Sequence, residues 1–153
     1  MNLKRYFCIL VSASLLCISG CSKNKPDNVT LSASPYYTLA VKSDGTVIST
    51  KADRQNYEYG QGNVSAWSDI VSVSAGYYHT VGLKSDGTVV STSLSDSKYD
   101  FGQTDVSAWK DIVAISAGYY HTVGLKSDGT VISTYVNKLD KSHGQNDVSD
   151  WTG

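Results

Sequence analysis

Residues 75–89 read AGYYHTVGLKSDGTV, and residues 117–131 read the same letters again. The similarity extends further, since residues 64–92 and 106–134 differ at only four positions. A more divergent copy comes first, with ASPYYT at residues 33–38 where the other copies have AGYYHT. The interval between copies is 42 residues throughout. Self-similarity at a fixed interval predicts one structural unit repeated along the chain.

Each copy has the sequence pattern of short β-strands. The segments 70–74 and 88–92 are β-branched and are bounded by turn residues. A second strand is expected around residues 79–84. In the turn between the second and third strands, Asp86 can bond its own turn backbone, and the glycine after it can adopt positive φ for a hairpin. This turn glycine recurs in every copy, as Gly45, Gly87 and Gly129. A fourth, weaker strand is expected around residues 106–109.

Three or four strands within one such interval are typical of a β-propeller blade, and such a blade must stack on its neighbours to bury both faces. We therefore expect an all-β fold of β-propeller blades in tandem, with three repeats at about 29–67, 71–109 and 113–151. Three blades are too few for a ring closed within one chain, so an incomplete, open arc is expected. Because exposed blade edges promote aggregation, either self-association covers them or the chain is a truncated gene product.

The N-terminal segment of the chain predicts export. Lys4 and Arg5 precede an apolar run, residues 8–18, that is too short to span a bilayer comfortably. The run ends in ISGC at residues 18–21, which resembles the lipobox of bacterial lipoproteins. We expect a signal peptide at residues 1–20, a lipidated Cys21 with a polar tether over 21–28, and an extracytoplasmic location on the cell membrane or outer membrane. The alternatives are a simple secretory leader or an uncleaved anchor, with Cys21 incidental.

The composition argues against several classes of function. The formal net charge is -1, and no basic patch invites nucleic acid. All three cysteines lie in the leader region, so no disulfide is expected in the repeats. The chain has no Gly-x-Ser-x-Gly elbow, Walker loop or His-Glu-x-x-His pair. We expect no enzyme activity, no catalytic residue and no cofactor.

Three kinds of residue recur with the repeat and have structural interpretations. His79 and His121 are candidates for base or metal chemistry, but one histidine per blade fits a buried residue that bonds backbone at the blade junction. Each aspartate turn has a single acid, too few for calcium, so no metal site is expected. The tryptophans are wedges between blades or exposed platforms for sugar or peptide, with packing favoured. They are Trp67, Trp109 and Trp151.

Tyrosine gives the clearest indication of a binding surface. A Tyr-Tyr pair stands between the first two strands of each copy, at residues 36–37, 77–78 and 119–120. In a stack of blades these pairs line up along one rim, and tyrosine has a large contact area with a polar tip. We expect Tyr36, Tyr77 and Tyr119 to bind a ligand, and the second tyrosines of the last two pairs to be structural.

The repeat resembles that of the regulator of chromosome condensation family. The resemblance covers about residues 29–151 and rests on Ala-Gly-x-x-His-Thr, Asp-Gly-x-Val and Gly-Gln, in that order in each copy with some decay. It implies propeller blades, which in this family typically form closed rings of seven. The family's Trp-Gly after the third strand is Ser-Thr here, at residues 49–50, 91–92 and 133–134. Since one fold carries many functions, the resemblance indicates function only weakly.

The expected function is a surface-tethered binding module, with partners that are a protein or cell-wall ligand and a membrane reached through the lipid anchor. An alternative is an inhibitor of a secreted enzyme, because the chain resembles secreted bacterial propellers with short blades that block β-lactamases. A further alternative is a remnant without independent function. Guanine-nucleotide exchange, the activity of the family's nuclear namesake, is disfavoured because export separates the chain from small GTPases.

Overall fold

The computed structural model describes residues 30–50, 57–136 and 143–152, and within them the chain forms three separate antiparallel sheets. Each sheet has three strands in chain order, so the first strand pairs with the second and the second with the third. The strands are β1 (Leu31–Ala33), β2 (Thr38–Val41), β3 (Val47–Ser49), β4 (Ile70–Ala75), β5 (Thr80–Lys84), β6 (Val89–Ser91), β7 (Ile112–Ala117), β8 (Thr122–Lys126) and β9 (Val131–Ser133). A short 3₁₀ turn, η2 (Ser97–Tyr99), follows the second sheet.

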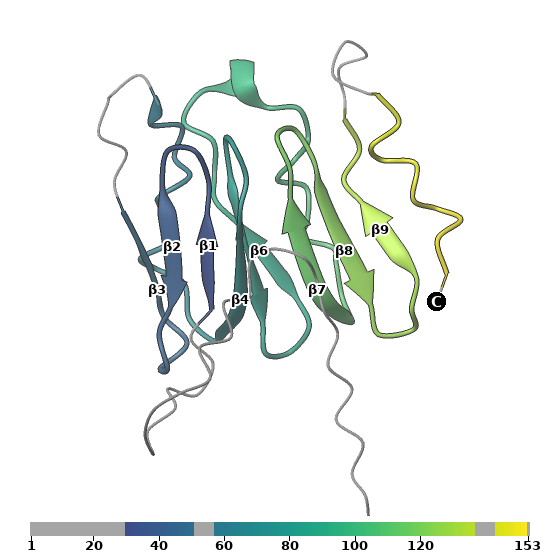
Figure 1. Cartoon of the computed structure of the whole chain (residues 1–153), viewed down its shortest axis with the longest axis horizontal. Helices are drawn as coiled ribbons and strands as arrows, with labels where there is room; N and C mark the ends of the chain where they lie inside the picture. The colour runs from purple at the N-terminus through teal and green to yellow at the C-terminus, as the bar shows by residue number, and fades with distance from the viewer. Residues whose placement is uncertain (1–29, 51–56, 137–142, 153) are drawn as a thin grey trace, which may run out of the picture.

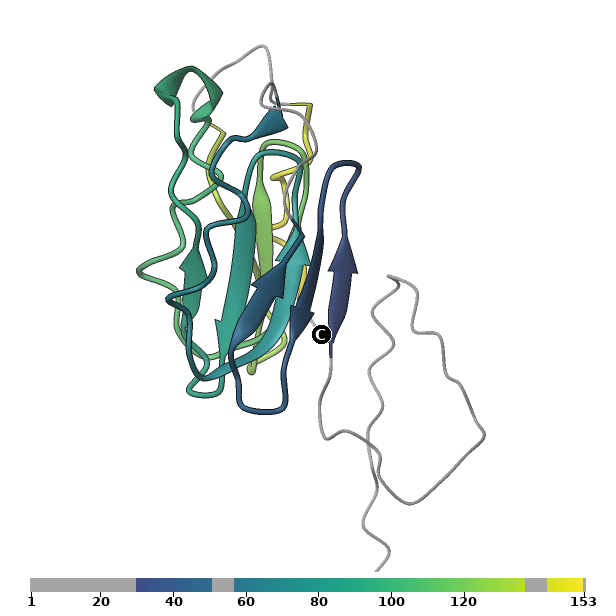
Figure 2. The same ribbon diagram turned by 90° about the vertical axis from the view of Figure 1, so that its left-hand side faces the viewer.

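The sheets stand side by side in an open row (Figure 1), and the second and third lie behind the first when the molecule is viewed from its β1–β3 end (Figure 2). The strands of the second and third sheets begin and end at equivalent positions of the repeat. The all-β fold of tandem blades in an unclosed arc is therefore confirmed. We refer to the three sheets with the segments after them as the first, second and third blades.

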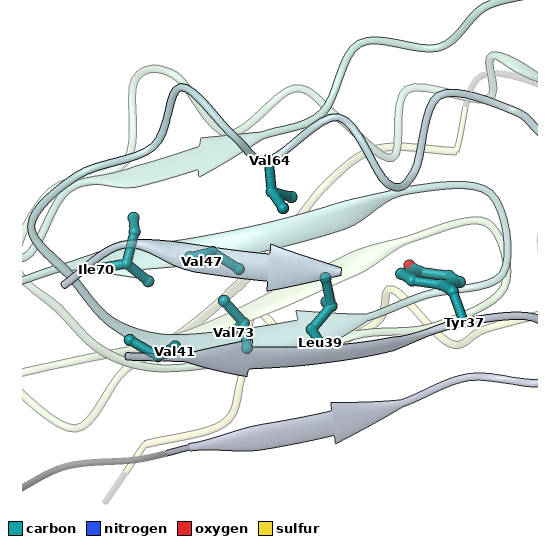
Figure 3. Close-up of a cluster of buried hydrophobic side chains, with 7 residues drawn as sticks. All are labelled: Tyr37, Leu39, Val41, Val47, Val64, Ile70 and Val73. Carbon is teal, nitrogen blue, oxygen red and sulfur yellow. The ribbon is translucent and has the colours of Figure 1, made fainter. Parts of the chain in front are cut away.

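Hydrophobic cores lie between blades rather than inside them. The first core joins Leu39, Val41 and Val47 of the first blade to Ile70 and Val73 of β4 (Figure 3). An equivalent core joins the second and third blades, and it contains Val81, Leu83, Val89, Val106, Trp109 and Ile112. Because each sheet buries its face only against a neighbour, every blade depends on the next for its stability.

The hairpin turns also connect neighbouring blades. Gly45 has φ of 76° and Gly87 of 81°, a region that favours glycine. At this position the chain can turn so that the Gly45 carbonyl accepts a hydrogen bond from the Ile70 N–H (3.0 Å). The Gly87 carbonyl accepts the equivalent bond from Ile112 (3.0 Å), which ties the second blade to the third.

The expectation of a fourth strand around residues 106–109 was wrong. This segment consists of consecutive turns, in which the Val106 N–H donates to the Thr104 carbonyl (2.8 Å) and the Trp109 N–H donates to the Val106 carbonyl (3.0 Å). The turns direct Val106 and Trp109 into the same core. Apolar residues three apart reach one side of a turn, whereas on a strand they would point to opposite faces.

Candidate functional site

The three tyrosines expected at the rim form one continuous row. Tyr36, Tyr77 and Tyr119 each lie in the connection between the first and second strands of a sheet. The hydroxyls of Tyr36 and Tyr77 are 2.7 Å apart, and their rings meet edge to face with centroids 5.1 Å apart. The rings of Tyr77 and Tyr119 are stacked at 3.9 Å. Tyr119 is the most accessible of the three, with 43% of its surface exposed.

A second aromatic layer supports this row from the interior. Tyr78 is buried and its ring contacts those of Tyr77 and Tyr119 at centroid distances of 4.7 and 5.4 Å. The structural role expected for Tyr78 agrees with this burial. The remaining aromatic side chains of the layer are Tyr57, Tyr59, Tyr99, Phe101 and Tyr120.

Several of these supporting rings were not anticipated as neighbours of the rim. Tyr57 stacks on Tyr36 with centroids 4.2 Å apart, and Tyr99 stacks on Tyr78 at 4.8 Å. Both come from the long connection between the third strand of one blade and the next blade. The sequence contained one indication of their shared role, because Tyr99 in the second copy is the equivalent of Tyr57 in the first.

The row of tyrosines is an uncharged surface that can form hydrogen bonds. The pKa of Tyr36 is raised by its hydrogen bond with Tyr77 and by burial, and that of Tyr77 is raised mainly by its interaction with Tyr119. These phenols therefore stay neutral at physiological pH. Beside the row runs a shallow groove of about 220 Å³ whose lining consists mostly of small residues. It is lined by Ala33, Ser34, Pro35, Ala75, Gly76, Tyr77, Ala117, Gly118 and Tyr119.

The two repeat histidines differ, and His79 is the one that takes part in blade packing. His79 is fully buried, and its Nε2 lies 2.8 Å from Thr122 Oγ1 in the next blade. That hydroxyl already donates to the Gln103 carbonyl (2.8 Å), so His79 donates from Nε2. The expectation that this histidine bonds backbone was wrong, because its partner is a side-chain hydroxyl. His121 is half-buried and faces no following blade in the described part of the chain.

We expect the buried His79 to make stability dependent on pH. Burial, with a smaller contribution from His121, lowers the pKa of His79 to about 3, against 6.5 for an unperturbed histidine. At mildly acidic pH, His79 is therefore protonated in the unfolded chain but stays neutral in the folded chain. The free energy of unfolding that His79 contributes above pH 6.5 is lost as the pH falls towards 3. Between pH 7 and 5 the free energy of unfolding should fall by about 2 kcal/mol, measured by urea denaturation.

The matched controls are His79→Gln and His121→Gln. The first should lose most of this pH dependence. The second should keep it, because Nδ1 of His79, which has no partner among the described residues, would still have to be protonated inside the core. An unchanged pH dependence in His79→Gln would show that another group is responsible.

The tryptophans differ in their surroundings although they are equivalent in sequence. Trp67 and Trp109 lie between blades, and a Cβ placed on Gly82 or Gly124 would be 2.8 Å from the respective indole ring. The glycines thus provide room for these rings. Trp151 is 59% exposed and has no such contact in the described residues.

The aspartate turns bind their own backbone. Asp86 Oδ1 accepts hydrogen bonds from the N–H (2.9 Å) and hydroxyl (2.6 Å) of Thr88, which lower the pKa of the carboxyl group. Asp44 and Asp128 make the same contacts with Thr46 and Thr130. Residues 30–50, 57–136 and 143–152 contain no cluster of acids, histidines or cysteines suited to a metal ion.

The proposed lipidation site, Cys21, the leader before it and the tether after it lie outside the described residues. Among the residues that are described, no helix is long and apolar enough to cross a bilayer.

Comparisons with known proteins agree with the blade geometry. The model of the regulator of chromosome condensation (RCC1) repeat matches residues 70–103 and 112–134. No curated protein sequence matches the chain.

Among solved structures, yeast RCC1 (Prp20) bound to Kap60 is similar with a TM-score of 0.56 and 20% identity, over 78% of this chain and 32% of that one. Prp20p of Saccharomyces cerevisiae, from a study of its binding to Gsp1p and histones, is similar with a TM-score of 0.53 and 20% identity, over 77% and 32%. The ectodomain of the Physcomitrella patens receptor kinase CR4 has a TM-score of 0.52 and 17% identity, over 71% and 29%.

The chain thus spans about a third of the length of these structures, and the low identities show a shared fold alone. The family match falls on the second and third sheets, including the Asp-Gly turns and the strands on either side. The second and third blades therefore match the repeat of the regulator of chromosome condensation family, in a chain with the fold of RCC1 propeller blades.

Proposed function

We propose that this chain is a protein-binding module, held at an extracytoplasmic membrane surface by lipid on Cys21. Its binding surface is the rim formed by Tyr36, Tyr77 and Tyr119. The observation that carries the proposal is the continuous row of partly exposed tyrosine rings, in which the hydroxyls of Tyr36 and Tyr77 bond each other and the rings of Tyr77 and Tyr119 stack. The similar Prp20 was solved bound to Kap60 and was studied for its binding to Gsp1p and histones, which supports a protein ligand here.

The rim consists of neutral tyrosines, a composition that suits a protein ligand better than a strongly charged ligand. The tyrosine side chains of the rim pack against other rings, so they lose little conformational entropy when a ligand binds. They also offer a large contact area, as in many protein recognition surfaces. The lining of the neighbouring groove includes alanine and glycine, so an approaching chain can lie close to the backbone. A cell-wall glycan is the alternative ligand, and the experiment below separates the two.

The test is photo-cross-linking of the full chain in living cells. A benzophenone amino acid at position 119 should give products with a distinct protein, because Tyr119 is the most exposed ring of the row. The control position is Val113, which is 50% exposed near the start of β7, whereas Tyr119 follows the end of that strand. Products that are equal at both positions, that are dissolved by a muramidase, or that contain only a second copy would contradict the proposal.

Once the partner is purified, its affinity for the Tyr119→Ala variant provides the energetic test. We expect at least roughly fivefold weaker binding, since an aromatic anchor in a protein interface contributes more than about 1 kcal/mol. The Val113→Ala variant should bind as the unsubstituted chain does. Equal affinities for all three proteins would place the interface elsewhere.

A further inference from the structure

Residues at equivalent positions of the repeat form the two junctions between neighbouring blades. We call the face that a sheet turns to the following blade its leading face, and the opposite one its trailing face. In the first junction, leading-face side chains of Leu39, Val41 and Val47 pack against trailing-face Val73 and against Ile70 (Figure 3). The second junction repeats this arrangement with Val81, Leu83 and Val89 against Ile115 and Ile112.

Besides the turn contacts described above, polar contacts of two further kinds recur at both junctions. In the first kind, a backbone N–H donates to a serine hydroxyl of the preceding blade, from Ala75 to Ser32 (3.0 Å) and from Ala117 to Ser74 (2.9 Å). In the second kind, the side chain just before the second strand bonds a threonine of the following blade, as in Tyr37–Thr80 and His79–Thr122, both 2.8 Å. The junction is thus a specific interface that the chain makes twice.

The third blade has the same leading face, but this face is less covered. Val123, Leu125 and Val131 are only partly buried, whereas their equivalents in the second blade are between 0% and 4% exposed. Trp151 is 59% exposed, compared with 9% for Trp109. The apolar side chains of a blade junction are therefore present without a complete partner.

The first blade has an uncovered trailing face. Leu31 is 71% exposed, whereas its equivalent Val73 is 6% exposed. Ile48 is 53% exposed and is the equivalent of Val90, which packs against the first core. Thr38 is also exposed, although its equivalent Thr80 is completely buried. An antiparallel sheet with bare apolar residues on one face is complementary to the leading face described above.

We infer that the leading face of the third blade binds the trailing face of the first blade in a second copy of this chain. In this contact, Ser116 would accept a hydrogen bond from the backbone N–H of Ala33, and His121 would face Thr38, as their equivalents do within the chain. We expect a second copy to cover the leading face of the third blade, because the trailing face of the first blade is the equivalent of the surfaces that already form the two junctions within the chain. Such a head-to-tail contact produces a ring where the rotation closes and a filament where it does not.

One position departs from the internal junctions. Ala40 stands where the other blades have Gly82 and Gly124, and those glycines leave the room that the tryptophan ring fills. In the contact between copies, Trp151 must lie against a methyl group, so its ring cannot take the position of Trp109. The Ala40→Gly substitution should therefore strengthen the association, because it provides the missing space.

The test is sedimentation velocity of the full chain in a neutrally buoyant detergent. The unsubstituted protein should form assemblies larger than one chain as its concentration rises. Leu31→Asp, on the trailing face, and Val131→Asp, on the leading face, should each weaken association by more than about tenfold, because each would bury a carboxylate. Val113→Asp should have no effect. Circular dichroism checks that each variant is folded, and Trp151→Asp replaces Val131→Asp if that strand is disturbed.

Mixing the two variants gives the sharpest result. A Leu31→Asp chain keeps its leading face and a Val131→Asp chain keeps its trailing face, so an equimolar mixture should form dimers and nothing larger. A protein that stays monomeric up to about 100 μM, well above the micromolar range of weak complexes, would overturn the inference. Assemblies that survive both substitutions, or a mixture that stays monomeric, would also overturn it. None of these variants changes the tyrosine row, so the outcome is independent of the proposed function.

Discussion

The Trp109→Ala variant should lose about 4 kcal/mol of stability, within the range observed for removing a buried tryptophan. Trp109 is 9% exposed and its ring lies in the core between the second and third blades, beside Ile112 and against Gly124. Removing the ring leaves a cavity that the two sheets cannot close without shifting. The measurement is urea or thermal unfolding followed by circular dichroism, at a concentration where the chain is monomeric.

The matched control is Trp151→Ala, the same substitution at the equivalent position of the next copy. Because Trp151 is 59% exposed, the loss should be below about 0.5 kcal/mol. Since blades interact mainly with their neighbours, Trp109→Ala should also separate unfolding of the third blade from that of the other two, giving a broadened transition. Equal losses of stability in the two variants would mean that the Trp109 ring is not packed between the second and third blades as described.

The strands and their stacking could be predicted because local chemistry and the repeat agree. The β-branched segments between Asp-Gly turns became β4–β9, with bounds that recur at equivalent positions of the repeat. Gly82 and Gly124 also stand at equivalent positions, and the structure places a tryptophan ring against each. Tyr77 and Tyr119 are equivalent residues of the repeat and so were expected to lie in line, whereas Tyr36 is the equivalent of Tyr78 and joins the row through the hydrogen bond between its hydroxyl and that of Tyr77.

The letters of the repeat do not specify how much each copy is buried, and only the expected open arc indicated that the outer blades would be exposed. Trp109 and Trp151 are equivalent residues of the repeat, but only Trp109 is buried. Likewise Val81 is buried, whereas its equivalent Val123 is not. Burial in a stack depends on what lies on the next blade, and the repeat does not contain that information. The contact of Tyr57 with Tyr36 joins two separate segments of the first blade, and neither segment alone specifies it.

The turn segment at residues 106–109 was mistaken for a strand because Val106 and Trp109 are apolar and β-prone. The missing information was the geometry of the preceding loop. Gln103 is buried, accepts a hydrogen bond from the Phe101 N–H (2.7 Å) and donates one to the Tyr99 carbonyl (2.7 Å). These contacts hold the loop in a tight curve, and the chain enters residues 104–109 as turns.

The same loop leads to the second large effect, which we expect from Gly102→Ala. Gly102 has φ of 87°, which costs a residue with a side chain about 1–2 kcal/mol. Its added Cβ would also collide with the backbone carbonyl of Tyr135, in the segment that follows β9 of the next blade. A backbone atom cannot rotate away as a side chain can, so we expect a total loss of about 3 kcal/mol or more, measured by urea denaturation.

Two equivalent glycines separate the contributions of backbone conformation and contact. Gly144 has φ of 83°, but the nearest atom to its Cβ position is Asp147 Oδ2, 3.4 Å away on a flexible side chain. Gly144→Ala should therefore cost only the conformational part, about 1–2 kcal/mol. Gly60→Ala should resemble Gly102→Ala, because its Cβ would meet the Ser93 carbonyl in the same way. If Gly102→Ala and Gly144→Ala cost the same, the loops of neighbouring blades do not touch at Tyr135, and the junction between those blades is looser than the structure describes.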